Sequence, residues 1–137
     1  MRPISAAIAG AALALTLTGC NLTTPQPGGA PTGANAYEME DVVWVAPAFD
    51  DATLQFSGGQ MSGQAPCNGY SGENLATWPA FDFDAGEVAV TLMACPNDAL
   101  ETAFFAALRA ATRAAITGDG ALVLSNAAGP LIRFEPS

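Results

Sequence analysis

One segment of this 137-residue chain has apolar residues at helical spacing, whereas its other apolar segments are short and alternate like strands. The helical segment is PNDALETAFFAALRAATR, which begins at Pro96. Its apolar positions on one face are Leu100, Phe104, Leu108 and Ala111. An amphipathic helix needs a surface on which to bury that face, and strands supply one. We therefore expect an α+β fold in which a single helix packs on a sheet.

The ends of the expected helix carry charges that suit its dipole. Asp98, followed by Glu101, predicts a capping box with Asp98 as the N-cap. Arg109 and Arg113 are expected in the last turns, where a cation is stabilising. A helix that binds a partner is the alternative to a core helix, but little else in the sequence could cover the sheet.

The expected strands are short and bounded by Gly, Pro, Asn or Asp, as strands joined by tight turns usually are. They are 42–45, 52–56, 61–65, 81–84, 87–91, 115–117, 121–124 and 131–134. The turn at 57–60 predicts a hairpin between the second and third of these segments.

Residues 1–19 predict a lipoprotein signal peptide. Arg2 is followed by an apolar run, 6–17, that is too short to span a bilayer. The sequence Leu-Thr-Gly-Cys that ends at Cys20 resembles a bacterial lipobox. An ordinary signal peptide with a chance cysteine is the alternative. The resemblance implies cleavage before Cys20 and acyl chains, palmitate among them, that hold the protein at a membrane.

The segment 20–36 is expected to be the lipidated cysteine and a flexible linker, because it has no charge and few bulky apolar residues. Asn21 follows Cys20 directly. By resemblance to lipoprotein sorting in Gram-negative bacteria, this residue implies an outer-membrane lipoprotein that faces the periplasm. The globular domain is expected over 37–137.

Charge and composition exclude several functions. The chain has 13 acidic residues, 4 arginines, no lysine and no histidine, for a net charge of -9. Loss of Arg2 with the signal peptide would leave 3 arginines, and 3 minus 13 gives -10. This charge excludes nucleic acid as a partner. The absence of histidine excludes Ser-His-Asp and Cys-His catalysis and His-ligated metals. We expect no metal, no cofactor and a monomer.

Two cysteines remain in the domain, Cys67 and Cys95. An even number of cysteines in an oxidising compartment favours a disulfide between them. A redox or free-thiol role is the alternative, because Cys95 would lie just before the helix, where a thiolate is stabilised. The pair has no Cys-x-x-Cys spacing and no nearby basic residue, which favours the structural bond.

Two motifs resemble those of META domains, the HslJ-like family. The segment GQAPCNGYSG, 63–72, resembles G-x-x-x-C-N-x-Y-x-G, and AVTLMACP, 89–96, resembles A-x-T-R-M-A-C-P. The ending GDGALVLSNAAGPLIRFEP is also similar to that of the family. Apart from the two cysteines, the matching motif residues are Gly63, Asn68, Tyr70, Gly72, Thr91, Met93, Ala94 and Pro96. The chain departs from the second motif at Leu92, where relatives often have arginine.

The resemblance implies a small antiparallel β-sheet, curled toward a partly closed barrel, with one packed helix. It does not imply an enzyme, and it implies a loose connection with envelope stress responses. We expect a non-enzymatic binding module that contacts another envelope component, which would be a protein partner. We read Asn68 and Gly69 as turn formers, with Gly69 at positive φ. Tyr70 is expected in the core with its hydroxyl satisfied at the rim. A structural or chaperone-like accessory lipoprotein is the alternative to a binding module.

Two further features are candidate sites. Asp82 and Asp84 would share one face of a strand, with Glu87 across the turn. This acidic cluster suits weak Ca²⁺ binding or the paired carboxylates of a hydrolase, and the alternative is a solvated face. Trp78 lies between the two cysteines, where it suits a contact with a partner, and core packing is the alternative.

Overall fold

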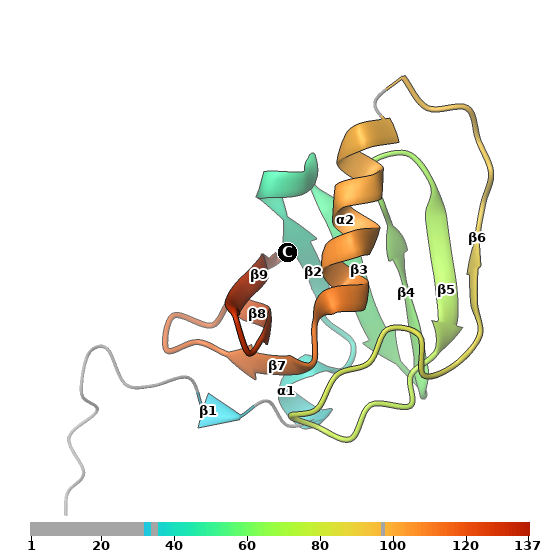
Figure 1. Cartoon of the computed structure of the whole chain (residues 1–137). Helices are drawn as coiled ribbons and strands as arrows, with labels where there is room; N and C mark the ends of the chain where they lie inside the picture. Colours follow the sequence, from blue (N-terminus) through green and yellow to red (C-terminus); the bar gives the residue numbers. More distant parts are fainter. Residues whose placement is uncertain (1–31, 34–35, 97) are drawn as a thin grey trace, which may run out of the picture.

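The computed structural model describes residues 32–33, 36–96 and 98–137, and its strands form a curled antiparallel sheet (Figure 1). The strands are β1 (Thr32–Gly33), β2 (Val43–Ala46), β3 (Ala52–Ser57), β4 (Gln60–Gln64), β5 (Gly69–Glu73), β6 (Val88–Val90), β7 (Arg113–Ile116), β8 (Leu122–Asn126) and β9 (Gly129–Pro136). The helices are α1 (Ala36–Met39), the 3-10 turn η1 (Pro47–Phe49) and α2 (Asp98–Ala110).

The order of the strands is β1-β7-β8-β9-β2-β3-β4-β5-β6, and the two outermost strands do not pair with each other. The long strand β9 joins the two halves of the sheet, because its first part pairs with β8 and its last part pairs with β2. The expected α+β fold, with a curled sheet that is not closed and one packed helix, is confirmed.

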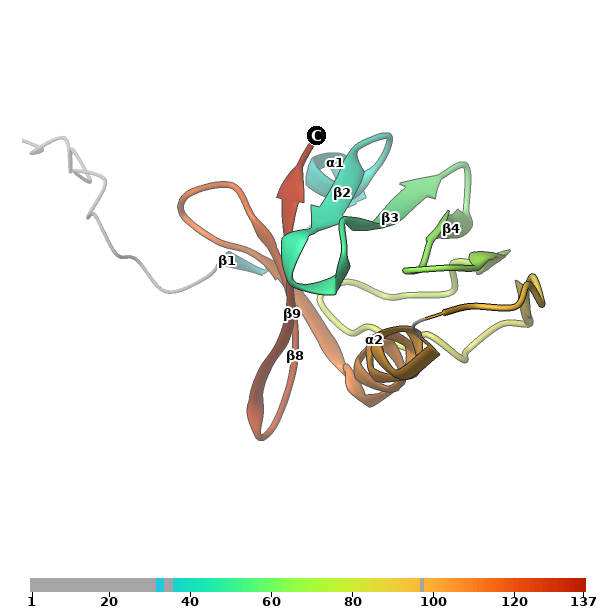
Figure 2. The ribbon, with the colours of Figure 1, turned by 90° about the horizontal axis from the view of Figure 1, so that it is seen from above.

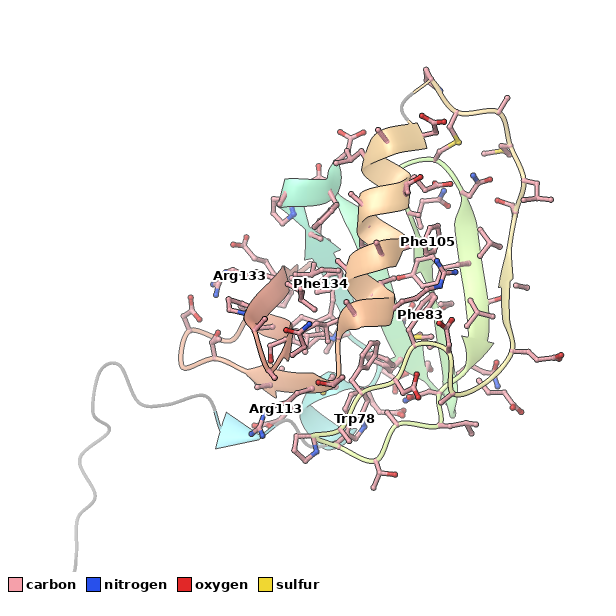
Figure 3. All side chains as sticks on the ribbon, in the orientation of Figure 1. Trp78, Phe83, Phe105, Arg113, Arg133 and Phe134 are labelled. Carbon is pink, nitrogen blue, oxygen red and sulfur yellow. A yellow bond between two sulfur atoms is a disulfide. The ribbon has the colours of Figure 1, made fainter. Side chains whose placement is uncertain are left out.

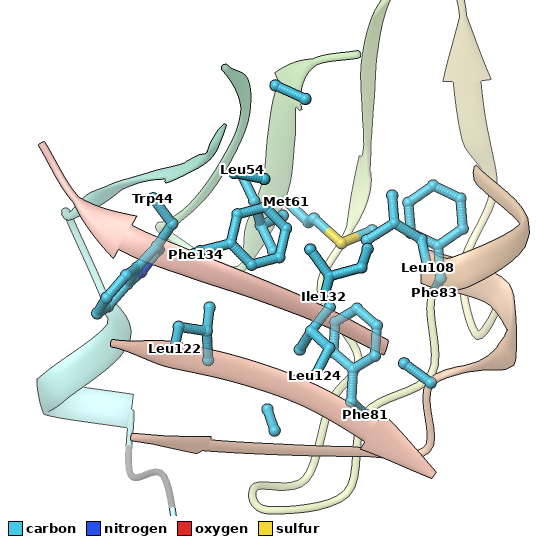
Figure 4. Packing of buried hydrophobic residues seen from close by; sticks show 14 of the residues in the cluster. Trp44, Leu54, Met61, Phe81, Phe83, Leu108, Leu122, Leu124, Ile132 and Phe134 are labelled. Carbon is cyan, nitrogen blue, oxygen red and sulfur yellow. The ribbon is translucent and has the colours of Figure 1, made fainter. Parts of the chain in front are cut away.

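Helix α2 lies between the two halves of the curled sheet, as the view from above shows (Figure 2). It buries Phe104, Phe105 and Leu108 toward the strands. Facing side chains of the sheet fill the rest of the core (Figure 4); among them are Trp44, Leu54, Met61, Leu122, Leu124, Ile132 and Phe134. Alternation sets this arrangement, because every second residue of β3 from Ala52 to Phe56 is buried. Each buried Leu, Ile, Met or Phe side chain of this core contributes about 1.5–3 kcal/mol to folding.

The segment 81–84 is not a strand, which corrects the expectation from its alternation. Phe81 and Phe83 are buried while Asp82 and Asp84 are exposed, so the two faces were assigned correctly. The segment turns back at 83–86 instead of pairing along a neighbour. Aromatic packing therefore produces the alternating pattern here without a β-ladder.

Strand β5 lies where the sequence suggested only a turn. Gly69 begins this strand and does not have a positive φ, so the expected left-handed glycine is wrong. Tyr70 alone supplies a large apolar side chain to β5, whose other residues are Gly, Ser and Glu. Such a strand has no apolar alternation to reveal it, and its position follows from pairing with β4 and β6.

The end of helix α2 and the start of the domain also differ from expectation. Helix α2 ends at Ala110, and Arg113 is the first residue of β7, so Arg113 does not complement the helix dipole. Thr32 and Gly33, expected in the linker, pair with Ile116 and Ala115 of β7. The exposed edge of a strand offers backbone groups that any residue type can pair with, which explains β1 without an apolar pattern.

The signal peptide and Cys20 lie outside the described residues. Within the described part of the chain, no helix is long and apolar enough to cross a membrane.

Candidate functional site

The two family-like motifs meet at one end of the sheet, where Cys67 and Cys95 form a disulfide. Cys67 lies in the loop between β4 and β5, and Cys95 lies in the segment between β6 and α2. Their Cα atoms are 5.8 Å apart. The bond therefore ties the β4–β5 loop to the segment that leads into the helix. It leaves no free thiolate for the redox role considered from the sequence.

Asn68 is the centre of the polar contacts beside this disulfide. Its side chain is buried, with 5% of its surface exposed, and its amide Nδ2 donates to Glu101 Oε1 (2.6 Å) and to Cys95 Sγ (3.3 Å). Its Oδ1 accepts from the Thr91 hydroxyl (2.8 Å) and from the Met93 backbone N–H (2.7 Å). Both donors and both acceptor positions of the amide are thus used, so Asn68 is a structural anchor and not a turn former.

Glu101 has a different role from the expected capping box. Its carboxylate reaches from α2 to the β4–β5 loop, where Oε2 accepts from the backbone N–H groups of Cys67 (2.9 Å) and Asn68 (2.7 Å). Partial burial acts to raise the pKa of Glu101. The hydrogen bonds from the Asn68 side chain and from the two backbone groups outweigh that effect, so the pKa is lowered. Glu101 is therefore held ionised as a second anchor.

Sequence reasoning placed Glu101 at the helix start but missed this contact. The acceptor and its Cys67 donor are separated by 34 positions, and local spacing carries no information about such a pair. An acidic residue shortly after the second cysteine motif was the available signal. We refer to Cys67, Asn68, Thr91, Met93, Cys95 and Glu101 together as the Asn68 cluster.

The Asn68 cluster offers little reactive chemistry. Among the described residues, Cys67, Cys95 and Glu101 are the group whose potential metal-ligating atoms lie close together, within 4.8 Å of one another. The disulfide removes both thiolates, which are the species that bind a metal. Within the same part of the chain, every buried side-chain nitrogen and oxygen has a hydrogen-bond partner. The geometry is that of a clamp between the helix and the sheet.

Three other motif residues shape the sheet below the Asn68 cluster. The buried Tyr70 donates its hydroxyl hydrogen to the Thr53 carbonyl oxygen (2.7 Å), and burial raises the pKa of that phenol. A Cβ atom at Gly63 would lie 2.0 Å from the same carbonyl oxygen. One at Gly72 would lie 2.6 Å from the Glu87 carbonyl oxygen. These glycines are therefore required by close backbone approach, and the expected place of Tyr70 matches the structure.

The remaining motif residues lie on an exposed segment. Ala94 and Pro96 are exposed, and so is Met93, whose side chain is 60% accessible although its backbone is bound to Asn68. Leu92 is 97% exposed. The segment between β6 and the disulfide thus presents apolar side chains to solvent from a fixed backbone.

Trp78 is partly buried and packs against the core (Figure 3). Its ring meets Phe56 edge to face, with centroids 5.0 Å apart, and stacks on Phe81 with centroids 6.4 Å apart. This packing is the alternative considered from the sequence, and it leaves part of the indole accessible.

The acidic residues of the β5–β6 connection do not converge. Asp84 pairs with Arg109 (Oδ2 to Nε, 3.4 Å), whose guanidinium also lies over the rings of Phe83 and Phe105. Asp82 Oδ1 accepts from the Asp84 backbone N–H (3.1 Å), which is a local turn contact. The two aspartates therefore serve the turn and the helix, and they do not join the group of metal-ligating atoms found among the described residues.

Two shallow hollows mark the described surface. One, of about 270 Å³, lies over β4, β5 and β6; its lining includes Gly69, Ser71, Ala89 and Thr91. The other, of about 370 Å³, lies between the Trp78 loop and β7; its lining includes Thr77, Pro79, Thr112 and Arg113. The first hollow borders the exposed segment that follows β6.

Comparisons with known proteins address the fold and the family. No curated protein matches this chain. A solved structure, the NMR structure of a protein from Burkholderia xenovorans, is similar with a TM-score of 0.55 and 22% sequence identity. The match covers 83% of this chain and 97% of that one, and at this identity it shows a shared fold. The sequence profile of the META domain matches residues 33–137, which include both cysteine motifs, so this chain belongs to the META domain family.

Proposed function

We propose that this protein is a lipid-anchored META-domain module of a Gram-negative envelope that binds another envelope component and has no catalytic activity of its own. The lipobox-like sequence before Cys20 supports the anchor, and Asn21 supports the outer membrane as its location. The Cys67–Cys95 disulfide suits a domain that works in the oxidising periplasm.

The observation that carries the proposal is the Asn68 cluster. The polar side chains of the two family motifs at this end of the sheet, Asn68 and Thr91, are used by contacts within the fold, and the Asn68 side chain has no hydrogen-bonding group left for a substrate. The chemistry that remains accessible beside it is apolar and belongs to Leu92 and Met93. A rigid clamp that presents exposed apolar side chains suits binding rather than catalysis.

Crosslinking in intact cells, followed by purification of the lipidated protein, tests the binding role. A partner that is recovered reproducibly, and lost when Cys20→Ala mislocalises the protein, supports the proposal. Recovery of no partner above background contradicts it and favours an accessory lipoprotein without a fixed partner.

The anchor is tested separately by labelling with a radioactive or clickable palmitate. The natural chain should incorporate the label and sediment with the outer membrane. The Cys20→Ala chain should remain an unlabelled precursor, because the thiol of Cys20 must be lipidated before the signal peptide is cleaved. Label retained by Cys20→Ala contradicts the lipid anchor.

A further inference from the structure

Strand β6 ends the sheet, and among the described residues it pairs with β5 alone. Figure 1 shows it at the border of the ribbon. The Thr91 backbone N–H donates to the Gly69 carbonyl oxygen (3.0 Å), which fixes the direction of the backbone groups. These groups alternate along an antiparallel strand, so Ala89 also faces β5 while Val88 and Val90 direct their N–H and C=O groups outward. The outer edge of β6 can therefore accept another strand.

Although β6 is short, this edge lacks the charges, prolines and bulges that often block strand addition. Natural edge strands carry charges, prolines or bulges that oppose pairing with another chain. From Val88 to Cys95 this segment has no charged residue and no proline. Leu92 and Met93 follow β6 directly and have the largest exposed fractions of the large apolar side chains in the described part of the chain, at 97% and 60%. The segment is thus open to pairing in both its backbone and its side chains.

The edge is also held in place before any partner arrives. Met93 is fixed through its backbone N–H to Asn68, and Cys95 is fixed by the disulfide. A preformed edge costs less ordering entropy on binding than a mobile one. This gives the Asn68 cluster a consequence beyond stability, because it positions the segment that follows β6.

The shallow hollow of about 270 Å³ supplies a place for a side chain. Its lining includes Ala89, Val90 and Thr91 of the edge segment, together with small residues of β5. In strand addition the backbone bonds provide affinity, and hollows for alternate side chains provide selectivity. The hollow lies on the sheet beside the edge, where such a side chain would be directed.

Charge decides between the candidate occupants. Glu87 is exposed at the start of β6, and Glu73 is exposed at the end of β5, so the side chains at this end of the edge are acidic. The described residues carry 13 acids against 3 arginines. A second copy of this chain, or an anionic lipid surface, would be repelled by that charge. A cationic segment would be attracted.

We infer that the β6 edge binds an extended apolar segment of a partner as an added antiparallel strand, with a cationic residue of that segment beside Glu87. The inference rests on the proposed binding function and names the class of partner. Because an antiparallel strand runs opposite to β6, the cation lies at the C-terminal end of the bound segment.

The test uses the full chain, purified from membranes in a non-ionic detergent, and labelled hexapeptides with blocked ends. The probe is Val-Thr-Val-Thr-Val-Arg, and the matched control is its reversed sequence, which has the same composition. A third peptide is the probe with all its backbone nitrogens methylated, which prevents it from donating along either edge. Binding is followed by fluorescence anisotropy at low and high salt.

We expect the probe to bind about twofold to fivefold more tightly than the reversed peptide at low salt, and this difference to shrink at high salt. Methylation should abolish binding. Leu92→Ser should weaken binding about fivefold or more, because that side chain loses its apolar contact. The control Leu75→Ser, at an exposed leucine away from the edge, should leave binding unchanged.

Failure of the probe to bind, or equal binding of the methylated peptide, overturns the inference. A dimer in sedimentation that is lost in Leu92→Ser also overturns it, because the occupant is then a second copy. Vesicles of phosphatidylethanolamine and phosphatidylglycerol test lipid as the occupant. If they bind the Cys20→Ala chain but not the same chain with Leu92→Ser added, the inference is overturned in favour of lipid. If Leu92→Ser still recovers the crosslinked partner in cells, the binding function stands and the β6 edge is not its site.

Discussion

Replacement of Asn68 by alanine tests whether the Asn68 cluster stabilises the fold. The change removes the two hydrogen bonds that the amide donates and the two that it accepts. The bond to the ionised Glu101 is worth about 1.5–3 kcal/mol, and leaving the Met93 N–H without its acceptor costs about 1–3 kcal/mol. With the weaker bonds to Thr91 and Cys95, we expect a loss of about 3–5 kcal/mol. Small domains have about 5–15 kcal/mol in total.

Urea unfolding of the oxidised protein measures this loss, with the fluorescence of Trp44 and Trp78, which both pack in the core region, as the signal. Asn74→Ala is the matched control, because Asn74 makes a single side-chain hydrogen bond, from the Ala76 backbone N–H (3.2 Å), and should lose about 1 kcal/mol or less. Equal losses in the two variants would refute the assignment of Asn68 as the anchor.

Gly63→Ala should lose about 3 kcal/mol or more in the same assay, because its Cβ would lie 2.0 Å from the Thr53 carbonyl oxygen, while Gly118→Ala, with open space around its Cβ, should change stability little. A tolerated Gly63→Ala contradicts this packing. Glu101→Gln should destabilise the protein more at pH 7 than at pH 3: the lowered pKa of Glu101 gives stability that is full above its unfolded pKa of about 4.3 and is lost as the pH falls through the folded pKa. A gap between the urea midpoints of the two proteins that does not change with pH opposes this account. Cys67→Ser should lower the free energy of unfolding by about 3.5 kcal/mol, because the disulfide closes a loop between positions that are 28 apart in the sequence. Thiol titration of the unreduced natural protein should find no free thiol at Cys67 or Cys95. Two titratable thiols there would show that the bond does not form.

The parts of the fold that the sequence predicted correctly have local causes. The apolar spacing from Leu100 to Leu108 predicts α2, and the alternation from Ala52 to Phe56 predicts β3, because both patterns follow from burial of one face. Strand β5 was missed because residues other than Tyr70 are small or polar, and its neighbours alone define it.

The sequence predicted most residues of the candidate site, but not the contacts between them. The motif resemblance selected Asn68, Thr91 and Met93, which the structure brings together. The role of Glu101 depends on where α2 docks relative to the β4–β5 loop, which no local pattern specifies. The helical pattern runs on past Ala110 and so predicts Arg113 in the helix. In the structure Arg113 pairs with Ser125 of β8 and belongs to β7.

The position of β9 has a consequence for the order in which the domain can fold during synthesis. It is the last strand of the domain along the chain, yet it lies between β8 and β2 and holds the two halves of the sheet together. A nascent chain that lacks it has no strand that pairs with both halves, and the pairing with β2 spans most of the domain. Long-range pairing of this kind folds slowly. If the chain is exported, as proposed above, it would therefore stay unfolded while the translocation machinery engages it, and would complete its sheet only after crossing.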